Sequence, residues 1–269
     1  MKRAGAGALV VGLGVGLLTA CGSDEPVTLS GGTWRTLPPE DQVRGGKLAD
    51  RAMRLLSETD SVRLKVSMTA PQGTREVSLL VDRKGNCSGT FDEGEMKSGE
   101  IRVLADGLVF FRFRDSALDA ILAQAALRGP AVEARVKERT ALVRGKFMAV
   151  PAKDPSTAAL HSQCDLDRLM GPMGSGGGQD NKNTRAKPET YRDGKRVIPL
   201  VDAKGEMDAT LYVAADEKKP YALAMEMRQG RSRMEMEFSD NGKTVQVKAP
   251  PPSEIADIDL GSAGSLLEA

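Results

Sequence analysis

The sequence is poor in aromatic residues and in histidine. Phe, Trp and Tyr together make up 4% of its 269 residues, and His161 is the single histidine. So few aromatics argue against stacking platforms for bases or sugars. Charge of neither sign dominates, because 38 Lys and Arg balance 37 Asp and Glu, and no basic stripe is interleaved with aromatics. The composition therefore predicts a protein that does not bind nucleic acid.

Long apolar runs are also missing after the first 20 residues. Lys2 and Arg3 form a positive start, and residues 4–18 carry no charge. This uncharged run is shorter than the ~20 residues that a membrane-spanning helix needs. It has the length and position of the apolar region of a secretory signal. Residues 1–20 are therefore predicted to be a signal peptide.

The predicted signal peptide ends in Leu18-Thr19-Ala20-Cys21, which matches the lipobox of bacterial lipoprotein precursors. Small residues stand before a thiol that accepts a diacylglyceryl group. Acyl chains such as palmitate anchor a protein because each buried CH₂ contributes roughly 0.8 kcal/mol. We therefore expect lipidation of Cys21, export, and attachment to the outer face of the cytoplasmic membrane. The alternatives are an ordinary signal peptide with a chance cysteine, or an uncleaved anchor.

Two further cysteines, Cys87 and Cys164, remain after Cys21. Exported proteins live in an oxidising compartment, so this even pair is interpreted as a disulfide. Two free thiols or a metal pair are the alternatives. A metal would need His or carboxylate companions at ligand spacing, and His161 has none in an obvious arrangement. No metal and no cofactor are predicted.

Hydrophobic periodicity divides the exported chain into a tether and one domain. Residues 21–40 are polar and contain Gly and Pro pairs, which indicates a flexible tether. Apolar residues at helical spacing then predict a helix over 43–59. A single domain is predicted over residues 41–258, followed by a C-terminal tail at 259–269.

Most of the predicted domain alternates between apolar and polar residues, which is the period of a strand with one solvent-facing side. Such segments run over 62–69, 77–81, 87–91, 101–105, 108–113, 147–150, 211–213, 223–227, 234–238 and 245–247. Helices are predicted over 116–127, with Ser116-x-x-Asp119 as a capping box, and over 131–140. Residues 171–183 are Gly-rich and are predicted to be a loop between two halves. They lack the Lys-Ser/Thr that a P-loop needs.

So many one-sided strands with so few helices predict an α+β fold that is mainly antiparallel. We expect a curved, open half-barrel of about 10–11 strands, with a few helices forming a lid over the concave face. The apolar sides of the strands are candidates to line a cavity for an apolar ligand, and methionines adapt to ligands of variable shape. A filled core is the alternative interpretation. The candidate ligand residues are Leu64, Val66, Met68, Leu79, Val81, Leu211, Val213, Met225, Met227, Met234 and Met236.

Several segments resemble the LolA-like lipoproteins of high-GC Gram-positive bacteria, the LppX/LprG type. The resemblance implies an open antiparallel half-barrel with helices over an apolar cavity. It also implies carriage of lipids or lipoproteins between membrane and envelope, and it brings no catalytic motif. The segments that carry the resemblance are the lipobox, the helix before Ser61–Ala70, Gly85-Asn86-Cys87-Ser88-Gly89, Gly145-Lys146-Phe147, Cys164-Asp165-Leu166, Phe238-Ser239-Asp240 and Ala249-Pro250-Pro251.

These observations favour a monomeric, membrane-anchored lipoprotein that binds a lipid or another apolar ligand. An envelope protein–protein interaction module with no small ligand is the alternative. An enzyme is disfavoured, because the chain contains no Gly-x-Ser-x-Gly elbow to pair with His161. Asp165 and Asp167 are expected to cap or solvate a helix rather than to perform acid–base chemistry.

Overall fold

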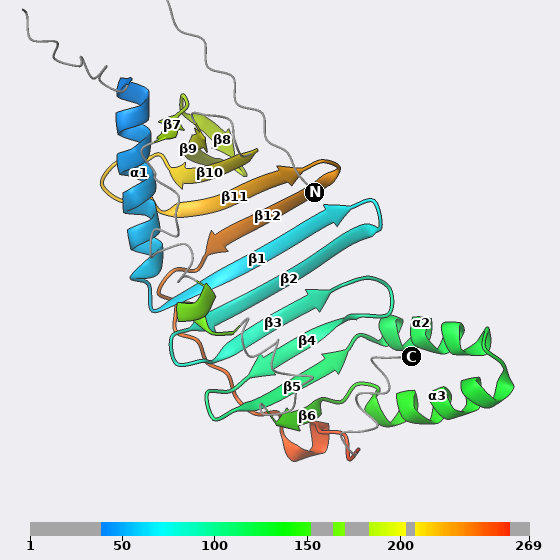
Figure 1. Cartoon of the computed structure of the whole chain (residues 1–269). Coiled ribbons are helices and arrows are strands. Elements are labelled where there is room, and N and C mark those ends of the chain that lie inside the picture. Colours follow the sequence, from blue (N-terminus) through cyan, green and yellow to red (C-terminus); the bar gives the residue numbers. More distant parts are fainter. Residues whose placement is uncertain (1–38, 152–163, 170–182, 203–207, 259–269) are drawn as a thin grey trace, which may run out of the picture. The chain divides into compact units, whose positions relative to one another are not determined.

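The computed structural model describes residues 39–151, 164–169, 183–202 and 208–258. Twelve strands form one antiparallel sheet (Figure 1) in the order β6-β5-β4-β3-β2-β1-β12-β11-β10-β9-β7, and β8 pairs with β9. The sheet is open, because its outer strands β6 and β7 do not pair with each other. This arrangement confirms the predicted open antiparallel half-barrel.

Most elements lie where hydrophobic periodicity predicted them. The helices are α1 (Glu40–Ser57), α2 (Asp115–Ala126) and α3 (Pro130–Val143). The first half of the sheet contains β1 (Ser61–Ala70), β2 (Gly73–Asp82), β3 (Cys87–Asp92), β4 (Ser98–Val103), β5 (Leu108–Phe113) and β6 (Met148–Pro151). The second half contains β7 (Thr184–Ala186), β8 (Thr190–Arg192), β9 (Lys195–Asp202), β10 (Ala209–Ala214), β11 (Ala222–Gln229) and β12 (Ser232–Ser239).

The two halves of the sheet join where β1 pairs with β12. The register places Leu64 opposite Phe238 and Val66 opposite Met236. Partner side chains of antiparallel strands lie on the same face. Leu64 also lies opposite Leu79. We call the side of the sheet that carries these residues the apolar face.

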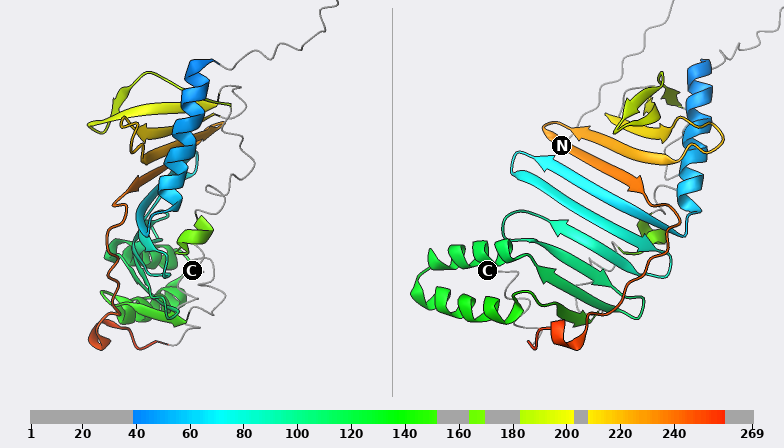
Figure 2. Two further views of the ribbon diagram at one scale, coloured as in Figure 1. Left: turned by 90° about the vertical axis from the view of Figure 1, so that its left-hand side faces the viewer. Right: turned by 180° about the vertical axis from the view of Figure 1, so that it is seen from behind.

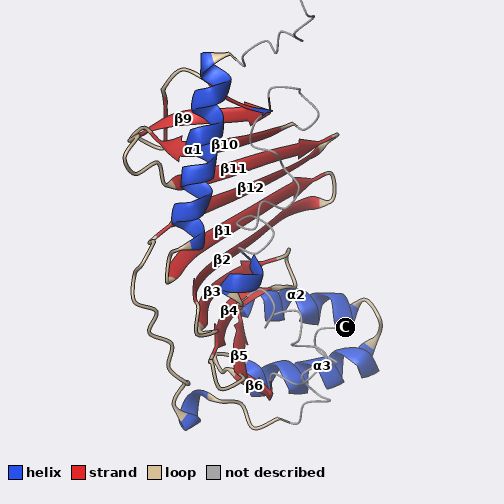
Figure 3. Cartoon of the chain, turned by 60° about the vertical axis from the view of Figure 1, so that its left-hand side comes forward, coloured by secondary structure: helices blue, strands red, loops and turns tan. Residues whose placement is uncertain are grey.

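Helices cover both ends of the apolar face (Figures 2 and 3). At one end α1 buries Leu48, Ala52 and Leu56 in a cluster that includes Phe238 and Val213. At the other end the helical hairpin α2–α3 packs on Phe111 and Met148, which lie opposite each other on β5 and β6. Phe91 packs against both clusters, so the core continues along the sheet.

The chain after Pro251 pairs with Phe147, the residue just before β6. Phe147 forms a parallel bridge with Ile255: its N–H donates to Glu254 O at 2.7 Å, and its carbonyl accepts from the Ala256 N–H at 2.8 Å. The Phe147 ring is fully buried, with the guanidinium groups of Arg102 and Arg112 each 4.5 Å from its centre. This segment occupies the start of that edge of the sheet, where another strand could otherwise pair.

Three local predictions were wrong. The sheet has twelve strands rather than 10–11: β7, β8 and β9 were not among the predicted segments, and β7 and β8 are only three residues each. Residues 245–247 form no strand. The capping box is absent as well: α2 begins at Asp115 after Arg114, with no side-chain cap. The predicted signal peptide, most of the tether, the loop at 171–182, His161 and the tail lie outside the described residues.

Candidate ligand-binding face

Two rows of apolar side chains cross the middle of the apolar face. One row consists of Val77, Val66, Met236, Met225 and Leu211, each directly opposite the next on β2, β1, β12, β11 and β10. The neighbouring row consists of Met68, Met234, Met227 and Ala209. We call these nine residues the methionine rows. Strands far apart in the sequence therefore build one continuous apolar strip.

The methionine rows are only partly covered. Met68 is 47% exposed, and the other eight side chains are half-buried. Val66, Val77, Leu211, Met225 and Met236 pack against the main core cluster without belonging to its fully buried set. Apolar surface left between two helical covers on one face of a sheet suits an apolar ligand, because binding removes that surface from water.

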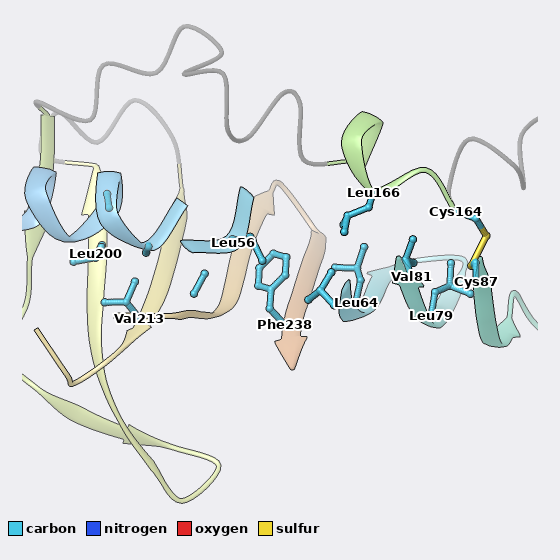
Figure 4. Close-up of a cluster of buried hydrophobic side chains, with 14 of the residues drawn as sticks. Leu56, Leu64, Leu79, Val81, Cys87, Cys164, Leu166, Leu200, Val213 and Phe238 are labelled. Atoms are coloured by element: carbon cyan, nitrogen blue, oxygen red, sulfur yellow. A yellow bond between two sulfur atoms is a disulfide. The ribbon is translucent and has the colours of Figure 1, made fainter. Parts of the chain in front are cut away.

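Four of the eleven candidate ligand residues are buried in the core cluster. Leu64, Leu79, Val81 and Val213 are all buried, and Figure 4 shows them beneath α1 and the segment that carries Leu166. Tertiary packing covers these four positions, although they follow the same apolar–polar alternation along their strands as the partly exposed candidates. The other seven candidates all belong to the methionine rows.

The helical turn at residues 166–169 is joined to the sheet by a disulfide. Cys87 of β3 is bonded to Cys164, with Cα atoms 5.4 Å apart, as expected from the sequence. Leu166 points from this turn towards Leu64 (Figure 4) and is buried. The Asp165 carboxylate accepts a hydrogen bond from the Arg168 N–H at 3.0 Å, and Asp167 pairs with Arg83. Both aspartates therefore have structural partners.

A charge cluster occupies the opposite side of the sheet, behind the methionine rows. Arg192 of β8 pairs with Glu226 of β11 and Glu235 of β12, and its guanidinium lies 4.3 Å from the centre of the Tyr212 ring. Arg233 pairs with Glu226 at 3.0 Å. Burial acts to raise the pKa of Glu226. The hydrogen bond and charge of Arg192, with the charge of Arg233, outweigh burial and hold that pKa below its usual range.

This charge cluster was not anticipated from the sequence. Glu226, Glu235 and Arg233 showed only as polar alternates along two strands. Arg192 lies far from them in the chain and belongs to a strand too short to recognise. Its ion pairs fasten β8 to β11 and β12, and they give the sheet a charged side that contrasts with the methionine rows.

Within the described parts of the chain, no three His, Cys, Asp or Glu side chains are grouped as metal ligands. None of the helices among those residues is both long and apolar enough to span a bilayer.

Comparison with solved structures identifies the fold. LprF from Mycobacterium bovis superposes with a TM-score of 0.50 at 11% identity, over 77% of this chain and 97% of LprF. The lipoprotein LppX from Mycobacterium tuberculosis gives a TM-score of 0.45 at 12% identity, over 77% of this chain and all of LppX. No family model matches the sequence, and no curated protein does. The chain thus has the half-barrel fold seen in LprF, although the two sequences are only 11% identical.

Proposed function

We propose that this protein is a lipid-anchored, extracytoplasmic lipoprotein that binds a lipid or another apolar ligand on the methionine rows. The observation that carries the proposal is the half-buried apolar strip between α1 and α2–α3. Its fold is that of LprF, a likeness of architecture alone. The lipobox at Cys21 supports an anchor that would keep the domain near the bilayer from which it draws ligand.

The methionine rows suit acyl chains for a physical reason. Unbranched thioether side chains rotate freely and are polarizable, so Met225, Met227, Met234 and Met236 can follow chains of different length and unsaturation. Covering a half-exposed apolar side chain contributes roughly 25 cal/mol per Å² of surface removed from water. Binding would therefore draw its free energy mainly from these side chains.

The test is binding of a fluorescent acyl probe, together with native mass spectrometry of protein purified from a bacterial host. We expect co-purified lipid and saturable probe binding. Met225→Gln with Met236→Gln should weaken the probe about tenfold, because polar amides replace apolar contacts of similar volume. The matched control is Thr69→Gln with Thr90→Gln, which alters exposed positions on the opposite side of the sheet. Protein that carries no lipid and binds no probe would sink the proposal.

The anchor has its own test. Wild-type protein should incorporate labelled palmitate and sediment with membranes, whereas Cys21→Ser should do neither. Labelling that persists in Cys21→Ser would show that the lipid is attached elsewhere.

Docking on another envelope protein is a second candidate, favoured by the exposed side chains of α2–α3. Leu127 is 83% exposed and Leu142 is 50% exposed. If this were the only function, Leu127→Ser with Leu142→Ser would impair the protein in cells. The methionine-row variant, by contrast, would be without effect there.

A further inference from the structure

The methionine rows run out to a rim of the sheet that is rich in arginine. Two neighbouring hairpin turns form this rim, β1–β2 at residues 70–73 and β11–β12 at residues 229–232 (Figure 1). The turns lie side by side because β1 pairs with β12 as far as Thr69 opposite Arg233. Residues 68–75 and 227–234 hold four arginines and no Asp or Glu.

Two of these arginines lie at the end of the methionine rows. Arg75 lies directly opposite Met68, so its side chain shares the face of the methionine rows. Arg231 lies in the two-residue turn that follows Arg228 and Gln229, three positions from Met234. At ~3.3 Å per residue, Arg231 lies roughly 10 Å along the strand from Met234, at the end of the methionine rows.

The other two arginines lie on the opposite side of the sheet. Arg233 pairs with Glu226 and Glu235 on the opposite side of the sheet. Arg228 alternates with Met227 and so faces that side too, next to Asp208, whose carbonyl accepts its backbone N–H at 2.8 Å. Arg75 and Arg231 are exposed, and neither forms an ion pair or side-chain hydrogen bond with any described residue.

We propose that the ligand is an amphiphile with an anionic headgroup, whose tail lies on the methionine rows and whose headgroup is held by Arg75 and Arg231. This inference rests on the proposed function and names the class of ligand. A guanidinium offers several N–H donors in a planar fork that matches a carboxylate or a phosphate. Its positive charge favours a ligand with an anionic headgroup over a ligand that has a neutral headgroup and the same acyl chain.

The experiment compares cis-parinaric acid with its methyl ester, two probes that share one chain and differ in charge. Titrations of the purified protein at pH 8 and low salt keep the acid ionised. Wild-type protein should bind the acid about fivefold more tightly than the ester. Arg75→Gln with Arg231→Gln should remove that difference and leave the ester affinity unchanged. Arg54→Gln with Arg128→Gln, at exposed positions of α1 and of the turn between α2 and α3, matches the charge change and should preserve the difference.

The outcomes separate this inference from the proposed function. Equal affinity of wild-type protein for acid and ester would overturn the headgroup assignment while the apolar site stands. If neither probe binds, the proposed function itself fails. If Arg75→Gln with Arg231→Gln still binds the acid more tightly than the ester, Arg75 and Arg231 do not hold the headgroup. A further outcome is that wild-type protein binds acid and ester equally while Arg75→Gln with Arg231→Gln loses binding to phosphatidylglycerol vesicles. That result would show that the rim contacts the bilayer surface and would refute a bound headgroup.

Discussion

Gly45 of α1 lies directly against the backbone of Ala186 in the edge strand β7. A Cβ at position 45 would stand 2.6 Å from Ala186 N and 2.4 Å from Thr184 O. A salt bridge between Asp41 and Arg185, at 2.9 Å, flanks the contact. The helix can therefore cover this edge of the sheet only because residue 45 has no side chain.

Gly45→Ala should destabilise the protein. Alanine favours an isolated helix by up to ~1 kcal/mol, but here its methyl group meets backbone atoms that cannot turn aside, so we expect a net loss of about 2 kcal/mol. Urea denaturation measures it. Lys47→Ala, at an exposed position of the same helix, should change stability by less than about 0.5 kcal/mol. A stabilised Gly45→Ala protein would contradict the close approach.

Removing the disulfide should loosen the cover over the centre of the apolar face. Cys87 and Cys164 are 77 residues apart in the sequence, and Leu166 follows the second cysteine into the core. Cys87→Ala with Cys164→Ala should cost about 2–5 kcal/mol in denaturant unfolding. Dithiothreitol should destabilise wild-type protein equally and leave the variant unchanged. Two thiols that react with a labelling reagent in the unreduced wild-type protein would show that the bond is absent.

Glu226 should make stability depend on pH. Its folded-state pKa lies below the usual value, so the ionised form is favoured by folding. The stabilisation is complete above the unfolded pKa of about 4.3 and is lost as pH falls through the lowered folded value. Glu226→Gln should cost about 2 kcal/mol at pH 7, because it leaves Arg192 short of a partner.

That cost of Glu226→Gln should shrink as pH falls below about 4.3, the unfolded value, and on through the lowered folded-state pKa of Glu226, where the wild-type carboxylate becomes protonated as well. Thermal or urea unfolding between pH 3 and pH 7 provides the measurement. Glu95→Gln, in an exposed turn, is the control and should show no such trend. If the difference in stability between wild-type and Glu226→Gln protein stays constant over this pH range, the ion pairs of Glu226 are not its source.

Phe91 should couple the two ends of the core. Its ring packs against both clusters and meets the Phe113 ring edge-on, with centroids 6.4 Å apart. Phe91→Ala should cost about 2 kcal/mol, less than for a fully buried ring, and Phe91→Leu less than half of that. Hydrogen exchange should show α2–α3 losing protection before α1. Unchanged protection of α2–α3 in Phe91→Ala would show that the helical hairpin is held by other contacts.

Local patterns allowed much of this fold to be predicted. Alternation along β1, β11 and β12 assigned Met68, Met225 and Met236 to one face, since side-chain direction in a strand follows a period of two. The helical period before Ser61 located α1 to within three residues at its start and two at its end. The cysteine count and the expected compartment indicated the disulfide.

The sequence by itself thus determined which side of each strand is apolar, where the long helix lies and which cysteines pair. Only the tertiary structure decided which apolar residues remain open. Leu64 and Met68 share one strand and one face, yet α1 and the turn at Leu166 cover the first and leave the second exposed. Tertiary structure likewise decides that β1 pairs with β12 and that Arg192 contacts Glu226. The direction of a side chain along a strand is a local property of a few residues, whereas coverage and register depend on packing between separate segments, which no local period encodes.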